Sequence, residues 1–309
     1  MKIVIAGSGA MGLRFGLLLK RGGNDVTLID GWDKNIAAVR ENGVKADVNG
    51  QTLSAKMPIY KQDEVAPKIT NADLIIVFTK SMALDSMLTS IKPVIGGNTY
   101  ILCLLNGLGH EEVLEKYVAK DHIIMGVTMN AASMPAPGET KFDGNGQTEL
   151  QCLSSSGQQE VQKVVDVFNE SKIDSVYSEN VLYSIWRKAC VNGVVNSVCA
   201  LLEGTTVDFG HAKNADAITR TIVDEFADVA EREGIYLDRK EVVEHVESTW
   251  TMDHYPSMYQ DLVVNHRPTE IDYINGAVWR KGQKYGVATP YCACITNLVH
   301  AKEGMLNVK

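Results

Sequence analysis

Residues 2–30 read KIVIAGSGAMGLRFGLLLKRGGNDVTLID and carry the clearest structural signal in the chain. The short run 2–6, rich in β-branched residues, is typical of a buried strand. A glycine-rich turn follows, and then a helical pattern over 10–21 that Gly22 and Gly23 end. Residues 25–30 predict a second strand. A strand, a turn, a helix and another strand are how a parallel α/β sheet begins.

The glycine turn has the pattern G-x-G-x-x-G and consists of Gly7, Ser8, Gly9, Ala10, Met11 and Gly12. The first glycine permits a tight turn, the second lets a pyrophosphate approach the backbone, and the third lets helix and strand pack closely. The helix N-terminus would supply its dipole to the anion. We therefore predict that these six residues bind a dinucleotide. A glycine turn without a ligand is the alternative.

Asp30 ends the second strand, 18 positions after Gly12. A carboxylate at this place accepts hydrogen bonds from the adenosine ribose and repels a 2′-phosphate. The sequence therefore favours NAD as the cofactor. Two alternatives stay open, because Asp30 could serve only as a turn residue and Lys34 lies near enough to tolerate the phosphate of NADP.

Strand and helix signals alternate through the first half of the chain. Further strands are expected at 73–79, 99–105, 122–127 and 173–177, a helix at 158–170, and hairpins around Asn49-Gly50 and Asp143–Gly146. This alternation predicts a parallel sheet covered on both faces. Strand signals stop after Ser178, and we expect helices at 181–202, 213–233, 239–250, 269–285 and after Pro290. The predicted domains are 1–178 and 179–309.

The overall composition excludes several classes of protein. With 309 residues, 45% of them hydrophobic, the chain can bury two cores, and its net charge of −8 offers no field that attracts nucleic acid or an anionic membrane. The sequence contains no run of 18 uninterrupted apolar residues, so no membrane span is predicted. The six cysteines show no CxxC pairs, which favours reduced thiols and a cytoplasmic protein. The histidines have no metal-ligand spacing, so no metal site is predicted.

Lys188, Asn192 and Asn196 recur at i, i+4 and i+8 in WRKACVNGVVNSVCALL, so they share one face of a largely apolar helix. A solvated stripe is one interpretation, but such stripes favour Glu, Lys and Gln over the poor helix former Asn. In a dry cleft, desolvation would lower the pKa of the lysine and let it donate a proton to a forming alkoxide. The two amides could then bind a substrate carboxylate or hydroxyl.

A second polar cluster lies in the segment 255–276, where Ser257, Glu270 and Asn275 stand among apolar residues and turns. Helix capping by Ser257 and by Thr269 is a good alternative to a functional role. Asn106-Gly107 follows the strand at 99–105, at a carboxyl end where such sheets bind ligands. An ordinary Asn-Gly turn is the alternative.

Four motifs occur along the chain in the order GSGAMG at 7–12, LLNGLG at 104–109, RKACVNGVVN at 187–196 and SMYQDLVVNHRPTEIDYING at 257–276. Together they resemble the ketopantoate reductase family, which comprises 2-dehydropantoate 2-reductases and related D-2-hydroxyacid dehydrogenases. The resemblance covers essentially the whole chain. It implies an α/β fold with an N-terminal Rossmann dinucleotide-binding domain, an all-helical C-terminal domain and a cleft between them.

The resemblance also implies roles for individual residues. Lys188 would be the general acid on the 2-oxo oxygen, supported by Glu270, which would also lie near the nicotinamide ribose. Asn192, Asn196 and Ser257 would hold polar groups of the substrate. The expected cofactor-binding residues are those of the glycine turn, Asp30 and four residues added by the resemblance. In full they are Gly7, Ser8, Gly9, Ala10, Met11, Gly12, Asp30, Thr79, Lys80, Asn106 and Glu270.

Two departures from the family pattern point to a branch with other substrates. A basic residue commonly follows the second strand in NADPH-dependent members, whereas this chain has Asp30-Gly31-Trp32, and an asparagine three positions before Ser257 is replaced by His254. We expect reduction of a branched or aromatic 2-oxo acid to the D-2-hydroxy acid, with His254 in the substrate site, in a homodimer. The alternatives are a 2-dehydropantoate 2-reductase of pantothenate biosynthesis and a non-catalytic redox sensor that binds the dinucleotide.

Overall fold

The structure, a computed structural model, describes residues 1–65, 68–144 and 146–308. It divides into two compact units. The first unit consists of Met1–Leu105 and His110–Val181, and the second of Asn106–Gly109 and Leu182–Lys309. The short segment Asn106–Gly109 thus groups with the second unit, although it lies within the first half of the sequence.

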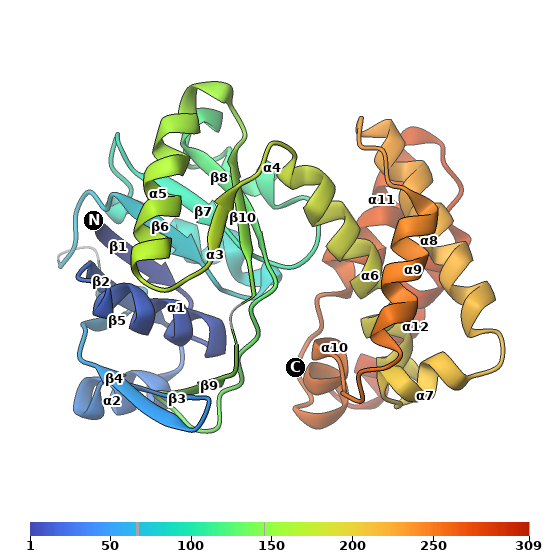
Figure 1. The fold of residues 1–309 in the computed structure, drawn as a ribbon, viewed down its shortest axis with the longest axis horizontal. Helices are drawn as coiled ribbons and strands as arrows, with labels where there is room; N and C mark the ends of the chain where they lie inside the picture. The colour runs from blue at the N-terminus through green and yellow to red at the C-terminus, as the bar shows by residue number, and fades with distance from the viewer. Residues whose placement is uncertain (66–67, 145, 309) are drawn as a thin grey trace. The chain divides into compact units, whose positions relative to one another are not determined.

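An eight-stranded sheet forms the centre of the first unit (Figure 1), in the order β11-β10-β8-β7-β6-β1-β2-β5. The strands are β1 (Lys2–Ala6), β2 (Asp25–Asp30), β5 (Ile59–Lys61), β6 (Leu74–Val77), β7 (Tyr100–Cys103), β8 (Ile123–Thr128), β10 (Thr148–Cys152) and β11 (Ser175–Tyr177). Strand β1 lies between β2 and β6, so the chain moves in opposite directions along the sheet on either side of it. Such a switch point is where open α/β sheets bind ligands.

The predicted parallel sheet is confirmed from β5 to β8 and is wrong at one edge. Strand β10 pairs antiparallel with β8, and β11 pairs parallel with β10. Every residue of β6 and β8 is buried. Because successive side chains point to opposite faces, both faces of the sheet are covered at these strands.

Helices α1 (Ala10–Arg21) and α5 (Gln158–Glu170) share a hydrophobic core with one face of this sheet (Figure 1). The rings of Phe15 and Phe168 meet edge to face with centroids 5.8 Å apart, which joins the two helices. The first unit also contains α2 (Asp33–Asn42), α3 (Leu84–Ser90) and α4 (His110–Leu114). The bounds predicted for α1, α5, β1 and β2 are confirmed.

A second sheet of three strands contains β3 (Val44–Val48), β4 (Gln51–Ala55) and β9 (Glu139–Phe142). The hairpin at Asn49-Gly50 is confirmed, because β3 pairs antiparallel with β4. The hairpin predicted around Asp143–Gly146 is wrong. Strand β9 pairs with β3 and strand β10 with β8 and β11, so the two strands that flank this turn belong to different sheets. Asn145 itself lies outside the described residues.

The described residues of the second unit form helices joined by loops and no strand, as predicted. None of the described helices is long and apolar enough to cross a membrane. Its elements are α6 (Val181–Leu202), α7 (Thr206–His211), α8 (Ala215–Arg232), α9 (Arg239–Thr249), α10 (Ser257–Tyr259), a π-helical turn (Gln260–Val264), a 3₁₀ turn (Ile271–Tyr273), α11 (Asn275–Tyr285) and α12 (Pro290–Met305). The helix expected at 269–285 therefore begins only at Asn275, after the 3₁₀ turn.

Helix α6 packs closely against its neighbours at Gly193. A Cβ there would lie 2.6 Å from the ring of Phe226 on α8. The side chain of Asn275, at the start of α11, is fully buried and donates to the Gly193 carbonyl at 3.0 Å. Asn275, which the sequence placed in a polar cluster, thus joins α11 to α6.

Glu225 of α8 anchors the start of α12. Its carboxylate is buried and accepts hydrogen bonds from the backbone N–H groups of Tyr291 at 2.7 Å and Cys292 at 2.8 Å. A carboxylate in this place satisfies donors that a helix N-terminus leaves without partners and complements the helix dipole.

We expect Glu225→Ala to lower the free energy of unfolding by about 3 kcal/mol, because two buried N–H groups lose their acceptor. Asp224→Ala is the matched control, since Asp224 is exposed and pairs with Arg239 at 3.1 Å, and it should cost less than about 1 kcal/mol. Urea unfolding followed by circular dichroism measures both. Equal losses in the two variants would contradict this role of Glu225.

Candidate functional site

The glycine turn follows β1 and is held tightly against the sheet. The Gly7 N–H donates to the Ile29 carbonyl at 3.0 Å, and Gly7 has φ +101°. A Cβ on Gly7 would lie 2.6 Å from the backbone of Phe78 and Thr79. Only glycine fits this conformation at this distance.

The other two glycines differ from each other in their surroundings. A Cβ on Gly12 would lie 2.0 Å from the Gly7 carbonyl oxygen, whereas a Cβ on Gly9 would have no atom within 4 Å. Gly9 is the exposed N-cap residue of α1 and has no side chain to cap the helix. Ser8 turns inward, and its hydroxyl donates to the Ile29 carbonyl at 3.1 Å. The first N–H groups of α1, at Ala10 and Met11, are therefore not capped by a side chain and can receive an anion.

Asp30 lies at the end of β2 with both carboxylate oxygens engaged. Its Oδ1 accepts from the Trp32 N–H at 3.0 Å and its Oδ2 from the Asn35 amide at 2.6 Å. Lys61 pairs with Asp30 in the sheet register, but its ammonium binds Asp33 at 2.6 Å. Asp30 thus shapes a turn and still presents a carboxylate next to the glycine turn.

The residues after β6 supply a further polar group near the glycine turn. The Thr79 hydroxyl oxygen is buried and makes no hydrogen bond to the described residues, and Lys80 is exposed. Buried hydroxyls normally have a partner. A nicotinamide dinucleotide fits this edge of the sheet, since a glycine cradle, an uncapped helix, an acceptor carboxylate and an unsatisfied hydroxyl all occur there.

The sequence analysis missed the pair formed by His110 and Ser81. The His110 ring is buried, and its Nε2 lies 3.0 Å from the Ser81 hydroxyl. Burial lowers the pKa of His110 to about 4, so the ring is neutral at physiological pH. The pair joins the chain after β6 to the first residue of α4. A histidine directly after the LLNGLG motif was the only signal in the sequence.

A narrow pocket in the second unit gathers polar side chains from separate segments. It is lined by Asn106, Asn196, Ser257, Met258, Asp261, Glu270 and Ile274. Its volume of about 10 Å³ admits about one water molecule. Of the residues predicted to be functional, four therefore lie together here: Asn106, Asn196, Ser257 and Glu270.

Asn196 and Ser257 contact each other in this pocket. The Asn196 amide donates to the Ser257 hydroxyl at 3.1 Å, and Asn196 is only 8% exposed. The solvated-stripe interpretation is thus wrong at Asn196. Capping by Ser257 is wrong as well, because Pro256 is the N-cap of α10 and no side chain caps it. Thr269 does accept from the Ile271 N–H at 3.4 Å, while donating to Glu303 at 2.8 Å.

Lys188 and Asn192 precede Asn196 on α6, and both are half-buried. Desolvation lowers the pKa of Lys188 to about 8, and the negative charge of Glu270 acts in the opposite direction. The side chain of Asn192 makes no hydrogen bond to another described residue. The helix therefore carries a lysine that can release its proton near neutral pH.

The LLNGLG motif places Asn106 beside these residues. The Leu108 N–H donates to the Tyr273 carbonyl at 2.8 Å. Gly107 has φ +100°, and a Cβ on it would lie 2.3 Å from the Tyr273 oxygen. The motif thus packs on the turn that carries Glu270, and Asn106 lines the pocket of the second unit.

His254 is not brought into this pocket. Its ring is exposed, and Nδ1 lies 3.0 Å from the Met252 carbonyl oxygen. The lining residues do not include it. The structure thus does not support a position for His254 beside Asn196 and Ser257.

Comparison with known proteins identifies the family. Residues 3–155 match the family described as ketopantoate reductase PanE/ApbA, and residues 180–303 match the ketopantoate reductase PanE/ApbA C-terminal family. The chain belongs to the ketopantoate reductase family. A 2-dehydropantoate 2-reductase of Lactococcus lactis is 51% identical over 313 residues and covers 100% of both chains, and one from Pyrococcus abyssi is 32% identical and covers 99% of both.

A solved structure of a D-mandelate dehydrogenase with NADH and anilino(oxo)acetate is also similar. It is 50% identical to this chain, covers 100% of both chains and has a TM-score of 0.96. The names of these similar proteins thus refer to two different substrates, 2-dehydropantoate and D-mandelate. The resemblance inferred from the four motifs is confirmed at the level of the family.

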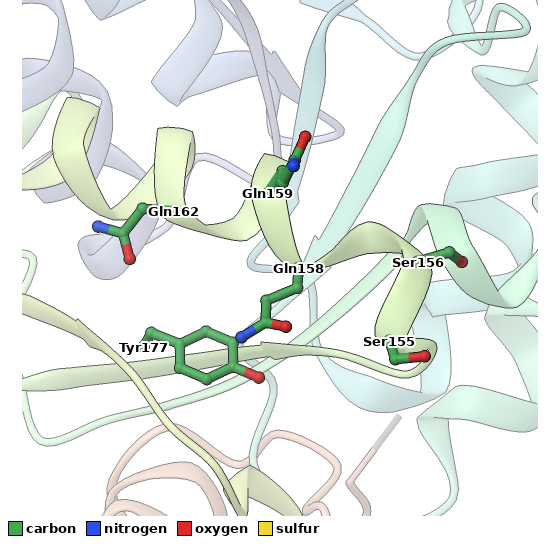
Figure 2. A pocket seen from close by; sticks show the side chains of 6 residues that line it. All are labelled: Ser155, Ser156, Gln158, Gln159, Gln162 and Tyr177. Carbon is green, nitrogen blue, oxygen red and sulfur yellow. The ribbon is translucent and has the colours of Figure 1, made fainter.

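A larger cavity of about 590 Å³ lies in the first unit, at the start of α5 (Figure 2). Its lining consists of Ser155, Ser156, Gln158, Gln159, Gln162 and Tyr177. Figure 2 shows the Gln158 amide beside the Tyr177 ring, with the two serines on the preceding turn. These side chains are uncharged, and none belongs to the predicted site. The cavity is thus larger than the polar pocket but has no group suited to acid–base chemistry at neutral pH.

We expect Gly9→Ala and Gly12→Ala to separate nucleotide binding from folding. The open space at Gly9 admits a methyl group, so Gly9→Ala should change Tm by less than about 3 °C and weaken NADH binding at least about tenfold, because the methyl keeps the pyrophosphate off the backbone. Gly12→Ala should lower both Tm and NADH affinity. Thermal denaturation and NADH fluorescence titration give the two readouts. Unchanged NADH affinity in Gly9→Ala would contradict a nucleotide at this turn.

Proposed function

We propose that this protein reduces a branched or aromatic 2-oxo acid to the D-2-hydroxy acid, with NADH as the hydride donor and Lys188 as the general acid. The observation that carries the proposal is the lysine itself, whose pKa of about 8 is set by desolvation and by Glu270. A general acid works best when its pKa lies near the operating pH. Residues 1–178 would form the dinucleotide domain and residues 179–309 the substrate domain.

The reaction needs a hydride and a proton. Bound NADH would supply the hydride to the substrate C2, and the electron pair of the carbonyl bond would then move onto oxygen. Lys188 donates a proton to that oxygen, and its positive charge stabilises the developing alkoxide. Glu270 keeps enough of the lysine protonated for this role and would also lie near the nicotinamide ribose.

Neutral groups would hold the substrate. Asn192, Asn196 and Ser257 can donate hydrogen bonds to a carboxylate or to the 2-oxo oxygen without adding charge. His254 would reach a substrate beside Asn196 and Ser257 only after the exposed turn that carries it rearranges. The pocket as described has room for about one water molecule, so substrate binding there would require the residues that line it to move apart.

The choice of NADH rests on Asp30. A carboxylate accepts hydrogen bonds from ribose hydroxyls and repels a 2′-phosphate. The ammonium of Lys61, its neighbour in the sheet, is occupied by Asp33. Thr79, Lys80 and Asn106 would contact other parts of the cofactor. NADPH is the alternative, with Lys34 as the cation that would accept the phosphate.

The D-mandelate dehydrogenase with NADH favours an aromatic substrate, because mandelate is an aromatic 2-hydroxy acid. The 2-dehydropantoate 2-reductase of Lactococcus lactis favours the second candidate, the reduction of ketopantoate. A redox sensor would need the glycine turn and Asp30 but not Lys188 or Glu270. The five buried cysteines, all free, suit a cytoplasmic enzyme, and we propose a homodimer from the resemblance alone.

A substrate panel separates the candidates. We expect NADH oxidation with 2-ketoisocaproate, 2-ketoisovalerate and benzoylformate, at kcat/KM values above that for ketopantoate, since an apolar pocket discriminates weakly among apolar side chains. The same panel with NADPH should give lower values. If ketopantoate wins by orders of magnitude, the protein is a 2-dehydropantoate 2-reductase. If no 2-oxo acid is reduced, the sensor is favoured.

Replacement of Lys188 tests the mechanism. We expect Lys188→Ala to lower kcat by about 10²–10⁴-fold and to leave NADH affinity nearly unchanged, because the glycine turn and Asp30 belong to the first unit. Lys188→Arg should not restore the rate, because guanidinium is a poor acid. Steady-state kinetics and NADH fluorescence titration on folded variants measure both. A kcat within about threefold of wild type in Lys188→Ala would rule out a general acid of the usual size.

The pH dependence follows from the same residue. Reduction needs the protonated lysine, so kcat/KM for the 2-oxo acid should fall as the pH rises through about 8, the pKa of Lys188. Oxidation of the 2-hydroxy acid needs the neutral lysine, so its kcat/KM should fall as the pH drops through the same value. The two profiles should therefore cross. Two flat profiles between pH 6 and about 9.5 would show that Lys188 does not carry the proton.

A further inference from the structure

We propose that Asn35 is a positioning residue that sets the preference for NADH by holding the Asp30 carboxylate in place. The proposal rests on the proposed function, in which Asp30 binds the adenosine ribose. Asn35 lies in the first turn of α2 and was not singled out by its sequence. Its side chain is fully buried, which is unusual for an asparagine on a helix.

The amide of Asn35 joins three segments of the first unit. Its Nδ2 donates to the Asp30 carboxylate at 2.6 Å and to the Ser8 carbonyl at 3.0 Å. Its Oδ1 accepts from the Gly138 N–H at 2.8 Å. The end of β2, the glycine turn and the chain before β9 thus meet at one side chain.

These partners require an asparagine in one orientation. The donor end of the amide faces two acceptors, and the acceptor end faces an N–H group. An aspartate would turn an oxygen toward the Asp30 carboxylate and the Ser8 carbonyl, and a leucine of similar size would leave all three partners unsatisfied. The network therefore fixes the amide, and the amide fixes Oδ2 of Asp30.

Asp30 has acceptor positions that no protein group occupies in these hydrogen bonds, and a cofactor could bind there. A carboxylate has about four acceptor positions. The Trp32 N–H and the Asn35 amide occupy one on each oxygen. The remaining positions can accept the 2′- and 3′-hydroxyls of an adenosine ribose, and a carboxylate held at both oxygens cannot turn away from a 2′-phosphate. Asn35 would thereby strengthen NADH binding and oppose NADPH binding together.

A double-mutant cycle tests this role by calorimetric binding of NADH and NADPH without substrate. The proteins are wild type, Asn35→Leu, Asp30→Ala and the double variant. We expect Asn35→Leu to lower the ratio of NADH to NADPH affinity about tenfold, the size expected for one charge-assisted hydrogen bond, and to change the ratio by less than about twofold when Asp30 is already alanine. With the best substrate of the panel, KM for NADH should rise while kcat stays within about twofold.

Asn24→Leu is the matched control for a merely structural loss. Asn24 is also a buried asparagine of the first unit, with its amide donating to the Leu19 carbonyl at 3.1 Å, away from the glycine turn. It should lower Tm without changing the cofactor ratio. The proposal is overturned if Asn35→Leu weakens NADH and NADPH equally, or if it shifts the ratio as much with Asp30→Ala as without it. Binding is measured without turnover, so the two proposals can fail separately. If the affinities follow the predicted cycle but the protein reduces no 2-oxo acid, the proposed reaction is wrong and the role of Asn35 is supported.

Discussion

The opposition between desolvation of the Lys188 ammonium and the negative charge of Glu270 is the interaction on which the proposed reaction depends. A lysine removed from water tends to lose its charge, and here its pKa falls to about 8. The negative charge of Glu270, more than 80 positions along the chain, opposes this shift and so favours the protonated lysine that the proposed reaction requires. Asn196 of α6, Ser257 of α10 and Glu270 after Thr269 line one pocket of the second unit. Buried polar groups need such partners.

In the first unit, the glycine turn leaves the first backbone N–H groups of α1 without a side-chain cap, so they can bind an anion. Gly7 and Gly12 allow β1, β6 and α1 to pack with no side chain between them, and Gly9 keeps the helix N-terminus open. The Trp32 N–H and the Asn35 amide each donate to one carboxylate oxygen of Asp30. The buried Asn35 side chain thereby links the end of β2 to the glycine turn and to the chain before β9.

Local sequence signals predicted the helices and strands well, but they did not predict which strands pair across long sequence distances. The bounds of α1, β2, α5 and α6 follow from glycines and from periodicity, which are local properties of the chain. The turn near Asp143 looked like a hairpin, because turn residues say nothing about which strands the flanking segments pair with. Strand β9 instead joins β3, almost a hundred positions away, and β10 reverses direction beside β8. Spacing and motif singled out Lys188, Asn196, Ser257 and Glu270 as candidates, but they did not predict the hydrogen bond from Asn196 to Ser257. Asn35 could have been noticed as a polar residue beside Ile36 and one turn before Val39, both buried.

The most direct test of this account is the pKa of Lys188, measured by NMR titration of ¹⁵N-labelled lysine side chains. Its signal would be assigned by its loss in Lys188→Arg. We predict a midpoint near 8, the value set by desolvation against the charge of Glu270, and a lower midpoint in Glu270→Gln, where the opposing charge is gone. A lysine that titrates near its ordinary value of about 10.4 and does not respond to Glu270→Gln would contradict the account.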